Sequence, residues 1–233
     1  MTKVKLWFSF DKKLKMKILV LGATGRTGRH IVEEALKQGY DLNVLVRDKN
    51  KISYNSPSIK VYQGTPARHA DLAAAMQGCD LIISALAIAR ASDAPWSKLI
   101  TPEHFISESM RNVIAEAGRQ NLKRLITISA WGVGETKKEI PFWLRWLIKY
   151  TNLGPVYAEH ESQEKLLANS SLNWTAVRPV ALNDSKKIKT LKTSFDNFPK
   201  PSLMISRHSV AKFMVDIVKS DKYDMKSPTI SEN

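Results

Sequence analysis

The chain has 233 residues, of which 43% are hydrophobic and 25% are charged, so a fibrous or low-complexity protein is excluded. The formal net charge of +14 attracts polyanions, a class that includes nucleotides, nucleic acids and acidic membrane surfaces. The single cysteine, Cys79, excludes an internal disulfide and favours a reducing, cytoplasmic location, where we expect this thiol to be buried and inert.

The first fifteen residues carry five lysines against Asp11 alone. Their apolar run LWFSF is shorter than the roughly 7–15 apolar residues of a secretory signal, so we expect residues 1–15 to be a disordered extension. No run in the sequence approaches the roughly 20 apolar residues that a transmembrane helix needs.

From residue 17 onward, short apolar runs alternate with amphipathic stretches. The predicted strands are 17–22, 42–47, 59–64, 80–87, 124–130 and 173–178, and the predicted helices are 26–38, 71–78, 102–120, 140–152, 156–170 and 206–220. This alternation favours an α/β fold of the Rossmann type, a doubly wound parallel sheet with helices on both faces. We expect one domain over 16–233, in which 131–233 completes the sheet and adds a small substrate-side lobe.

The first predicted strand is followed by the glycine pattern Gly22-x-x-Gly25-x-x-Gly28 and then by a helix. Such glycines permit a tight turn, a close approach of the backbone and close packing of helix on strand. The layout places a pyrophosphate at the N-terminus of the helix. An ordinary glycine-rich turn is the alternative. The residues predicted to bind a dinucleotide are Gly22, Ala23, Thr24, Gly25, Arg26, Thr27 and Gly28.

The end of the second predicted strand indicates which dinucleotide binds. An NAD enzyme carries an acidic residue there that accepts the ribose 2′-hydroxyl, whereas this chain has Arg47, followed by Asp48. A guanidinium pairs with a 2′-phosphate, so NADP(H) is favoured over NAD(H). We expect Arg26 to close on the same phosphate from the other side and Asp48 to be a turn or cap residue.

Several segments together resemble a known family. GATGRTG, LVRD, DLIISAL, YAEHESQEKLL, NWTAVRP and SRHSVAKFM follow the order seen in atypical short-chain dehydrogenase/reductases. Over about residues 16–220 the chain is similar to the single-domain NAD(P)H-binding proteins of the NmrA-like and flavin reductase/biliverdin reductase B kind. The resemblance implies the fold and the cofactor and leaves the substrate open, since the group includes both reductases and redox sensors.

The resemblance also implies which residues surround the nicotinamide half of the cofactor. Many relatives carry an aspartate near the adenine where this chain has Thr65, so the adenine contact stays open. The implied positions are Ser84, Ala85 and Leu86 along the nicotinamide-side ribose, Ser129 and Ala130 beside the nicotinamide, and Arg178, Pro179 and Val180 on the far side of its pocket.

The Tyr-x-x-x-Lys pair of the usual short-chain dehydrogenases is incomplete. Tyr157 is followed by Glu161, whose carboxylate would raise the pKa of the phenol, so Tyr157 is a poor candidate for the general acid. Resemblance to the flavin reductase-like branch implies a position for His160 and Glu164, and helical spacing lets both face the nicotinamide. The candidate catalytic residues are Ser129 and His160, the latter as a proton donor near neutral pH. The alternatives are a packing role for His160 and a lysine ion pair for Glu164.

Reduction of a flavin or a quinone scarcely needs a protein acid, because the acceptor is already electrophilic and water can supply protons. We therefore expect an NADP(H)-dependent oxidoreductase that passes hydride to a flavin, a quinone or a similar conjugated small molecule. The alternative is a non-catalytic, NmrA-like sensor of the NADP⁺/NADPH ratio that acts through a protein partner.

Two further segments carry expectations about partners. The aromatic stripe of 141–150 (Phe142, Trp143, Trp146 and Tyr150) could be core or an oligomer contact, a roof over a flat acceptor, or a membrane-surface helix. The lysines of 185–192 are expected to form a solvated basic face, since no nucleic-acid-binding motif accompanies them. No metal site is predicted, and the expected state is a monomer or a homodimer.

Overall fold

The computed structural model describes residues 15–187 and 189–233, so the expectation for residues 1–15 falls outside the described chain apart from Lys15. The central strands are β1 (Lys17–Leu21), β2 (Asp41–Val46), β3 (Ile59–Gln63), β4 (Leu81–Ser84), β5 (Arg124–Ile128), β6 (Asn173–Pro179), β8 (Leu191–Ser194) and β10 (Thr229–Glu232). The α-helices are α1 (Arg26–Lys37), α2 (His69–Met76), α3 (Phe105–Arg119), α4 (Phe142–Tyr150), α5 (Leu153–Ala168) and α6 (Arg207–Asp216). Three short 3-10 helices, η1 (Lys49–Lys51), η2 (Gly134–Lys138) and η3 (Ile217–Lys219), and two further strands, β7 (Ala181–Asn183) and β9 (Met204–Ser206), complete the described elements.

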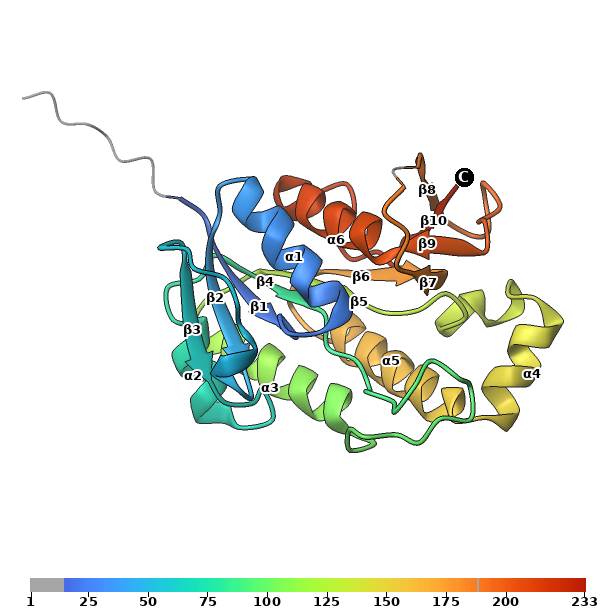
Figure 1. Cartoon of the computed structure of the whole chain (residues 1–233), viewed down its shortest axis with the longest axis horizontal. Coiled ribbons are helices and arrows are strands. Elements are labelled where there is room, and N and C mark those ends of the chain that lie inside the picture. The colour runs from blue at the N-terminus through green and yellow to red at the C-terminus, as the bar shows by residue number, and fades with distance from the viewer. Residues whose placement is uncertain (1–14, 188) are drawn as a thin grey trace, which may run out of the picture.

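Within the described residues, the central strands form one sheet in the order β3-β2-β1-β4-β5-β6-β10-β8 (Figure 1). The strands from β3 to β10 pair in parallel, and β8 pairs antiparallel with β10. β7 and β9 pair separately as a small second sheet beside α6. We call the small sheet together with the β8–β10 edge the C-terminal lobe.

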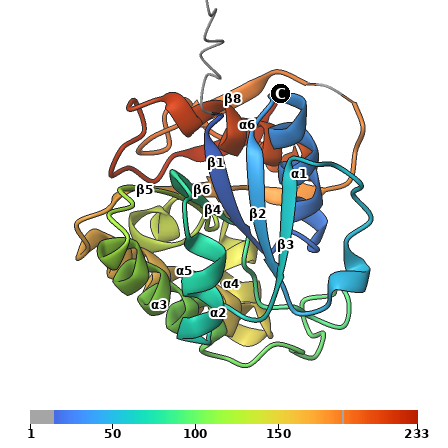
Figure 2. The same cartoon turned by 90° about the vertical axis from the view of Figure 1, so that its left-hand side faces the viewer.

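Helices cover both faces of the sheet. α1 and α6 pack together on one face, and α2, α3 and α5 lie on the other (Figures 1 and 2). Along β1, Ile18 and Val20 enter the core beneath α1 and α6, whereas Leu19 and Leu21 enter the core on the opposite face. Alternate residues of a strand point to opposite faces, so covering both faces makes β1 a continuous apolar run. The predicted Rossmann-type fold class is confirmed.

Every strand and helix predicted from the sequence forms, with ends shifted by a few residues. β4 ends at Ser84 rather than at residue 87 because the chain there leaves the sheet to pass close to Gly22. α6 ends at Asp216 rather than at residue 220, and the 3-10 helix η3 follows it. The strands β7 to β10 were not predicted. They are short, and β10 contains the polar residues Ser231 and Glu232, which are buried by partners from the C-terminal lobe.

The strand order places a topological switch point at β1. The chain moves from β1 outward through β2 to β3, and then returns to β4 on the other side of β1. Open α/β sheets bind ligands outside the carboxyl ends of the strands at such a point. The loop 22–25 lies there, between the carboxyl end of β1 and the start of α1.

Candidate functional site

Two glycines of the loop are required by its packing. Gly22 has φ +79°, and a Cβ atom on it would lie 2.7 Å from the carbonyl oxygen of Ala85 at the end of β4. A Cβ atom on Gly28 would lie only 2.0 Å from the carbonyl oxygen of Gly22. The first turn of α1 therefore rests directly on the loop, and the loop rests on the chain leaving β4.

Gly25 has a different role. It is exposed, has an ordinary φ of −74° and donates its N–H to the Gly22 carbonyl at 2.9 Å, immediately before α1 begins. No side chain of the described residues caps the N-terminus of α1, and its first turn holds no acidic residue. An uncapped helix N-terminus offers free N–H donors and the positive end of the helix dipole. The residues present therefore fit a pyrophosphate, which would approach over the bare Cα of Gly25.

Arg26 takes part in a small ion-pair network. Its guanidinium binds Asp93 at 2.7 Å and Asp184 at 3.2 Å, and Asp184 also accepts from Arg207 at 2.8 Å. Hydrogen bonding to Asp93 raises the pKa of Arg26 and lowers that of Asp93. Arg26 thus ties the start of α1 to the loop after β4 and to the segment after β7. The expectation that it closes on a 2′-phosphate together with Arg47 stays a prediction, and in this structure the partners of Arg26 are the two carboxylates.

Arg47 lines a cavity of about 630 Å³ beyond the carboxyl ends of β2 and β3. The cavity is also lined by Arg68 from the turn before α2 and by Phe105 from the start of α3. Arg47 is exposed and forms no ion pair with any described residue. Asp48 accepts a hydrogen bond from the N–H of Asn50 and caps η1, as expected of a turn residue.

Arg68 was missed in the sequence analysis. It pairs with Asp71 at 2.9 Å, and Asp71 also accepts from the N–H of Thr65 at 3.0 Å. A carboxylate therefore does lie beside Thr65, supplied by α2 instead of by the residue after Gly64. The available signal was the basic residue just before a helix that follows the third strand.

Of the residues expected along the nicotinamide-side ribose, Ser84 is fully buried, and its hydroxyl has no hydrogen-bond partner among the described residues. Leu86 is also buried, in the core shared with α2 and α3. Ala85 donates its N–H to the Leu21 carbonyl and presents its own carbonyl beside Gly22. At this strand end, the backbone of Ala85 rather than the Ser84 side chain lies next to the glycine loop.

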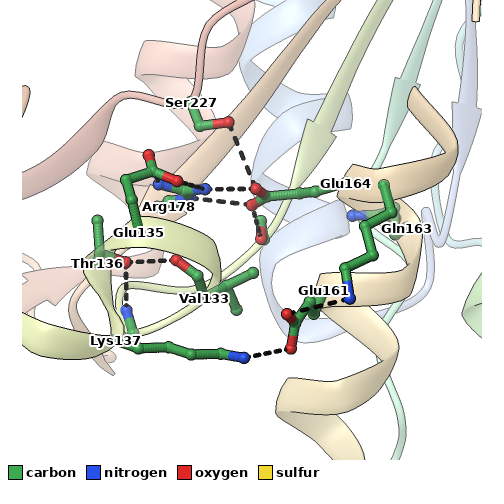
Figure 3. A network of polar contacts seen from close by, with 12 residues as sticks. Val133, Glu135, Thr136, Lys137, Glu161, Gln163, Glu164, Arg178 and Ser227 are labelled. Carbon is green, nitrogen blue, oxygen red and sulfur yellow. Dashed lines mark hydrogen bonds and ion pairs between the residues drawn. The ribbon is translucent and has the colours of Figure 1, made fainter. Parts of the chain in front are cut away.

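A buried polar network joins β5, β6, α5 and η2 (Figure 3). Ser129 donates its hydroxyl to Glu164 Oε1 at 2.5 Å. Arg178 donates to both oxygens of Glu164, at 3.0 and 2.5 Å, and to both oxygens of Glu135, at 2.5 and 3.1 Å. Ser129, Glu164 and Arg178 were expected near the nicotinamide, and the structure brings these three together.

The hydrogen bonds within this network offset the effect of burial on the pKa values of Arg178 and Glu135. Burial alone would lower the pKa of Arg178, but its hydrogen bonds to Glu164 and Glu135 outweigh burial and raise that pKa. Burial likewise opposes the charge of Glu135, and the hydrogen bond from Arg178 nevertheless lowers the pKa of Glu135. The network borders a groove of about 350 Å³ along α5 that is also lined by Trp174 and Met225. Ser129 belongs to this network, because its hydroxyl donates a hydrogen bond to Glu164.

Pro179 and Val180 follow Arg178 and are both buried. The Pro179 carbonyl accepts from the N–H of Trp131, and the N–H of Val180 donates to Ile230 in β10. Ala130, just after β5, is half-buried. These residues hold the carboxyl ends of β5, β6 and β10 together.

The surroundings of His160 weigh against the expected role as a proton donor near neutral pH. Its side chain is buried, which lowers its pKa to about 4, and its Nδ1 has no partner among the described residues. Tyr157 also stays protonated, because burial raises its pKa to about 12. The cause is burial and not the carboxylate of Glu161, which instead pairs with Lys137 and Lys165. The packing alternative for His160 is the one that the geometry favours.

Two expectations outside the site are also resolved. Cys79 is buried, and burial raises its pKa to about 12, so its thiol is inert as expected. The aromatic stripe on α4 is not part of the core: Phe142, Trp143, Trp146 and Tyr150 are all exposed. No α4 residue lines either of the two cavities described above, so a roof over an acceptor is not supported there. Across the described residues, no helix is both long and apolar enough to cross a membrane.

Known proteins share this chain's sequence features and its fold. A family model for NAD(P)H-binding proteins matches residues 22–221. An uncharacterised chloroplastic protein of Arabidopsis thaliana is 28% identical over 218 residues, which cover 90% of this chain and 74% of the relative. An isoflavone reductase homologue of Zea mays is 29% identical over 141 residues, or 54% of this chain, and the match spans only 41% of that relative's length.

Solved structures agree in fold over nearly the whole chain. A short-chain dehydrogenase/reductase from Veillonella parvula in complex with NADP has a TM-score of 0.74 at 17% identity, covering 93% of this chain and 94% of its own. An anaerobilin reductase from Escherichia coli O157:H7 has a TM-score of 0.74 at 19% identity, covering 93% and 97%. Because the family model spans most of the chain, this chain belongs to the NAD(P)H-binding family.

Proposed function

We propose that the protein is an NADP(H)-dependent oxidoreductase that passes hydride to a flavin, a quinone or a similar conjugated small molecule. The observation that carries the NADP(H) part is the pair of guanidinium groups, Arg47 and Arg68, lining one cavity beyond the ends of β2 and β3. Asp48, the residue that could instead bind a ribose hydroxyl, is engaged in capping η1. The cavity is also lined by Asp71, which pairs with Arg68, and by the exposed Glu108. Two guanidinium groups at that edge support a 2′-phosphate.

The chain's own residues would bind and orient the cofactor. The N–H groups at the start of α1 would hold the pyrophosphate, and Arg47 and Arg68 the 2′-phosphate. The nicotinamide supplies the hydride when it is bound. The anaerobilin reductase and the isoflavone reductase homologue are named as reductases, which supports the same class of reaction here.

The state of the three candidate proton donors, Ser129, Tyr157 and His160, supports this class of acceptor. His160 is neutral, Tyr157 holds its proton up to about pH 12, and Ser129 donates to Glu164. A carbonyl or alcohol substrate needs a positioned acid or base, whereas a conjugated acceptor can take its proton from water. The same observation fits a second candidate, an NmrA-like sensor that binds NADP⁺ or NADPH without turnover and signals through a protein partner.

One pair of measurements separates the two. The purified protein is titrated with NADPH, NADP⁺, NADH and NAD⁺, and NADPH oxidation is then followed with FMN and with a simple quinone. Binding of NADPH together with acceptor-dependent oxidation supports the reductase. Binding without oxidation, with a clear preference for one redox form, supports the sensor, and equal affinity for NADH and NADPH contradicts the NADP(H) assignment.

We further propose that residues 16–233 form one domain, with 131–233 contributing the substrate-side lobe, and that the protein is a cytoplasmic monomer or homodimer. The inert, buried thiol of Cys79 supports a reducing compartment. Sedimentation velocity and cell fractionation test the oligomeric state and the compartment.

A further inference from the structure

Helix α4 carries apolar side chains both toward the core and on its outer side. On the outer side, the exposed fractions are 76% for Phe142, 52% for Trp143, 47% for Trp146 and 58% for Tyr150. On the inner side, Leu144 and Ile148 pack against the core beneath α1 and α6. The inner side anchors the helix, so the aromatic side is left without a partner among the described residues.

Figure 1 shows α4 at the end of the molecule farthest from β3, beyond the N-terminal end of α5. The loop that follows β4 reaches the same end, because Asn152 donates to the carbonyl oxygens of Trp96 at 2.9 Å and Ser97 at 3.1 Å. Trp96 and Ile100 of that loop are 64% and 65% exposed. We call α4 together with residues 96–100 the aromatic tip.

The charges at the aromatic tip are cationic. α4 contains Arg145 and Lys149, both exposed, and no acidic residue. Lys98 and Lys138 add two more exposed cations. The nearby carboxylates of Glu135 and Glu161 are already paired, with Arg178 and with Lys137 and Lys165 respectively. Of the other carboxylates close in sequence to these segments, Glu139 is half-buried and Glu103 is exposed.

We propose that the aromatic tip docks the protein on the surface of an anionic phospholipid bilayer. Aromatic rings flanked by Arg and Lys suit the boundary between headgroups and acyl chains, where the rings enter the apolar layer and the cations remain at the phosphates. The helix, nine residues long, would lie in the plane of the surface. The net charge of +14 adds long-range attraction to the same surface.

The charge pattern favours lipid over a second copy of the chain. Two α4 helices meeting through their aromatic sides would bring Arg145 and Lys149 of both copies together, with no carboxylate on either helix to balance them. An anionic bilayer supplies that balance. The inference concerns a surface remote from the glycine loop and does not depend on the proposed function.

The test is cosedimentation of the full chain with vesicles of phosphatidylcholine alone or with about 30% phosphatidylglycerol. We expect binding to the anionic vesicles, with a blue shift of tryptophan emission. The double variant Trp143→Ser/Trp146→Ser should lower the partition coefficient at least about tenfold, since each ring contributes buried apolar area. The matched control is Phe198→Ser, which removes an 82% exposed ring from the C-terminal lobe and should leave binding unchanged.

Three results would overturn the proposal. The wild-type protein could fail to bind anionic vesicles, or the double tryptophan variant could bind as well as the wild type. In sedimentation velocity without lipid, a wild-type dimer that becomes a monomer in the double variant would assign the aromatic tip to self-association. Because all the substituted side chains are exposed, circular dichroism should show an unchanged fold in each variant.

Discussion

Burial decides the chemistry of the titratable side chains on α5. His160 and Tyr157 lie on the side of the helix that packs inward, and burial lowers the pKa of His160 to about 4 and raises that of Tyr157 to about 12. Glu164 lies on the same side but meets Arg178, which keeps a buried ion pair in place of an isolated charge. Which side chain on this face of the helix stands alone and which forms an ion pair therefore depends on the partner that each one meets.

His160 should make stability depend on pH. Its folded-state pKa of about 4 lies below the ordinary value of 6.5, so between these values the unfolded chain binds the proton and the folded chain does not. The free energy of unfolding should therefore fall as the pH drops from 6.5 to 4, by about 1.4 kcal/mol per pH unit from this group. Urea unfolding across this range measures it, and His160→Gln should remove this component of the slope. Identical slopes in the two proteins would contradict the lowered pKa.

Arg47 and Arg68 should determine the choice between the two dinucleotides. Arg47→Asp is expected to weaken NADPH binding by about a hundredfold, because it removes a charge-assisted contact and adds a repelling carboxylate. NADH binding should change little. Arg68→Ser should also weaken NADPH binding, but by a smaller factor, since Arg68 already pairs with Asp71. Lys51→Ser is the control, a basic residue nearby in sequence that does not line the cavity. Isothermal titration measures all four proteins, and equal losses for NADPH and NADH would refute the assignment.

At the scale of elements, contacts between segments define both the glycine loop and the polar network. The loop is compressed between α1 and the end of β4, so its glycines differ in what they tolerate. The polar network connects α5 to η2 through Arg178, which has two carboxylate partners from different elements. Arg178 thereby holds the segment after β5 against α5.

Substitutions of two glycines at the start of α1 should affect different properties: Gly28→Ala should lower stability, and Gly25→Val should prevent cofactor binding. A Cβ atom at Gly28 would overlap the Gly22 carbonyl at 2.0 Å, so Gly28→Ala should lower the unfolding free energy by several kcal/mol. At Gly25 the corresponding distance is 3.1 Å and φ is ordinary, so Gly25→Val should fold but no longer admit the pyrophosphate. Thermal melts with and without NADPH provide the readout. A Gly25→Val protein that NADPH still stabilises would show that the pyrophosphate lies elsewhere.

At the scale of the whole molecule, the C-terminal lobe is built into the main sheet. β10 is inserted between β6 and β8, and its Ile230 is completely buried in the core beneath α1 and α6. Glu232 of the same strand accepts from the N–H and the hydroxyl of Ser206 at the start of α6. These contacts join the last residues of the chain to a core that begins with β1.

This arrangement predicts a single unfolding transition for the described chain. Ile230→Ala should lower the unfolding free energy by about 2–4 kcal/mol, as expected for a cavity in a shared core. Leu203→Ala is the control, because Leu203 belongs to the same lobe but is 51% exposed, and it should cost less than about 0.5 kcal/mol. Urea unfolding followed by both fluorescence and circular dichroism is the measurement. A second transition in Ile230→Ala would mean that the lobe unfolds separately.

Local patterns account for what could be predicted. The periodicity of apolar residues predicted the strands from β1 to β6 and all six α-helices, because each repeats over its own few residues. The short strands β7 to β10 escaped prediction because their burial depends on partners elsewhere. Among site residues, Asp48 was correctly predicted as a cap because its partner lies two residues away. The ion pair of Arg26 with Asp93 was not predicted, because Asp93 lies 67 residues away.

The sequence by itself determined the fold class and the NAD(P)H-binding family of this protein, since the alternation of elements and the spacing of Gly22, Gly25 and Gly28 are local properties. Only the tertiary structure decided that His160 is neutral, that Glu164 holds Ser129 and Arg178, and that the aromatic side of α4 faces outward. The physical reason is that protonation, ion pairing and exposure depend on the groups that packing brings together. Those groups come from segments far apart in the chain, so a local sequence pattern does not indicate which of them pack together.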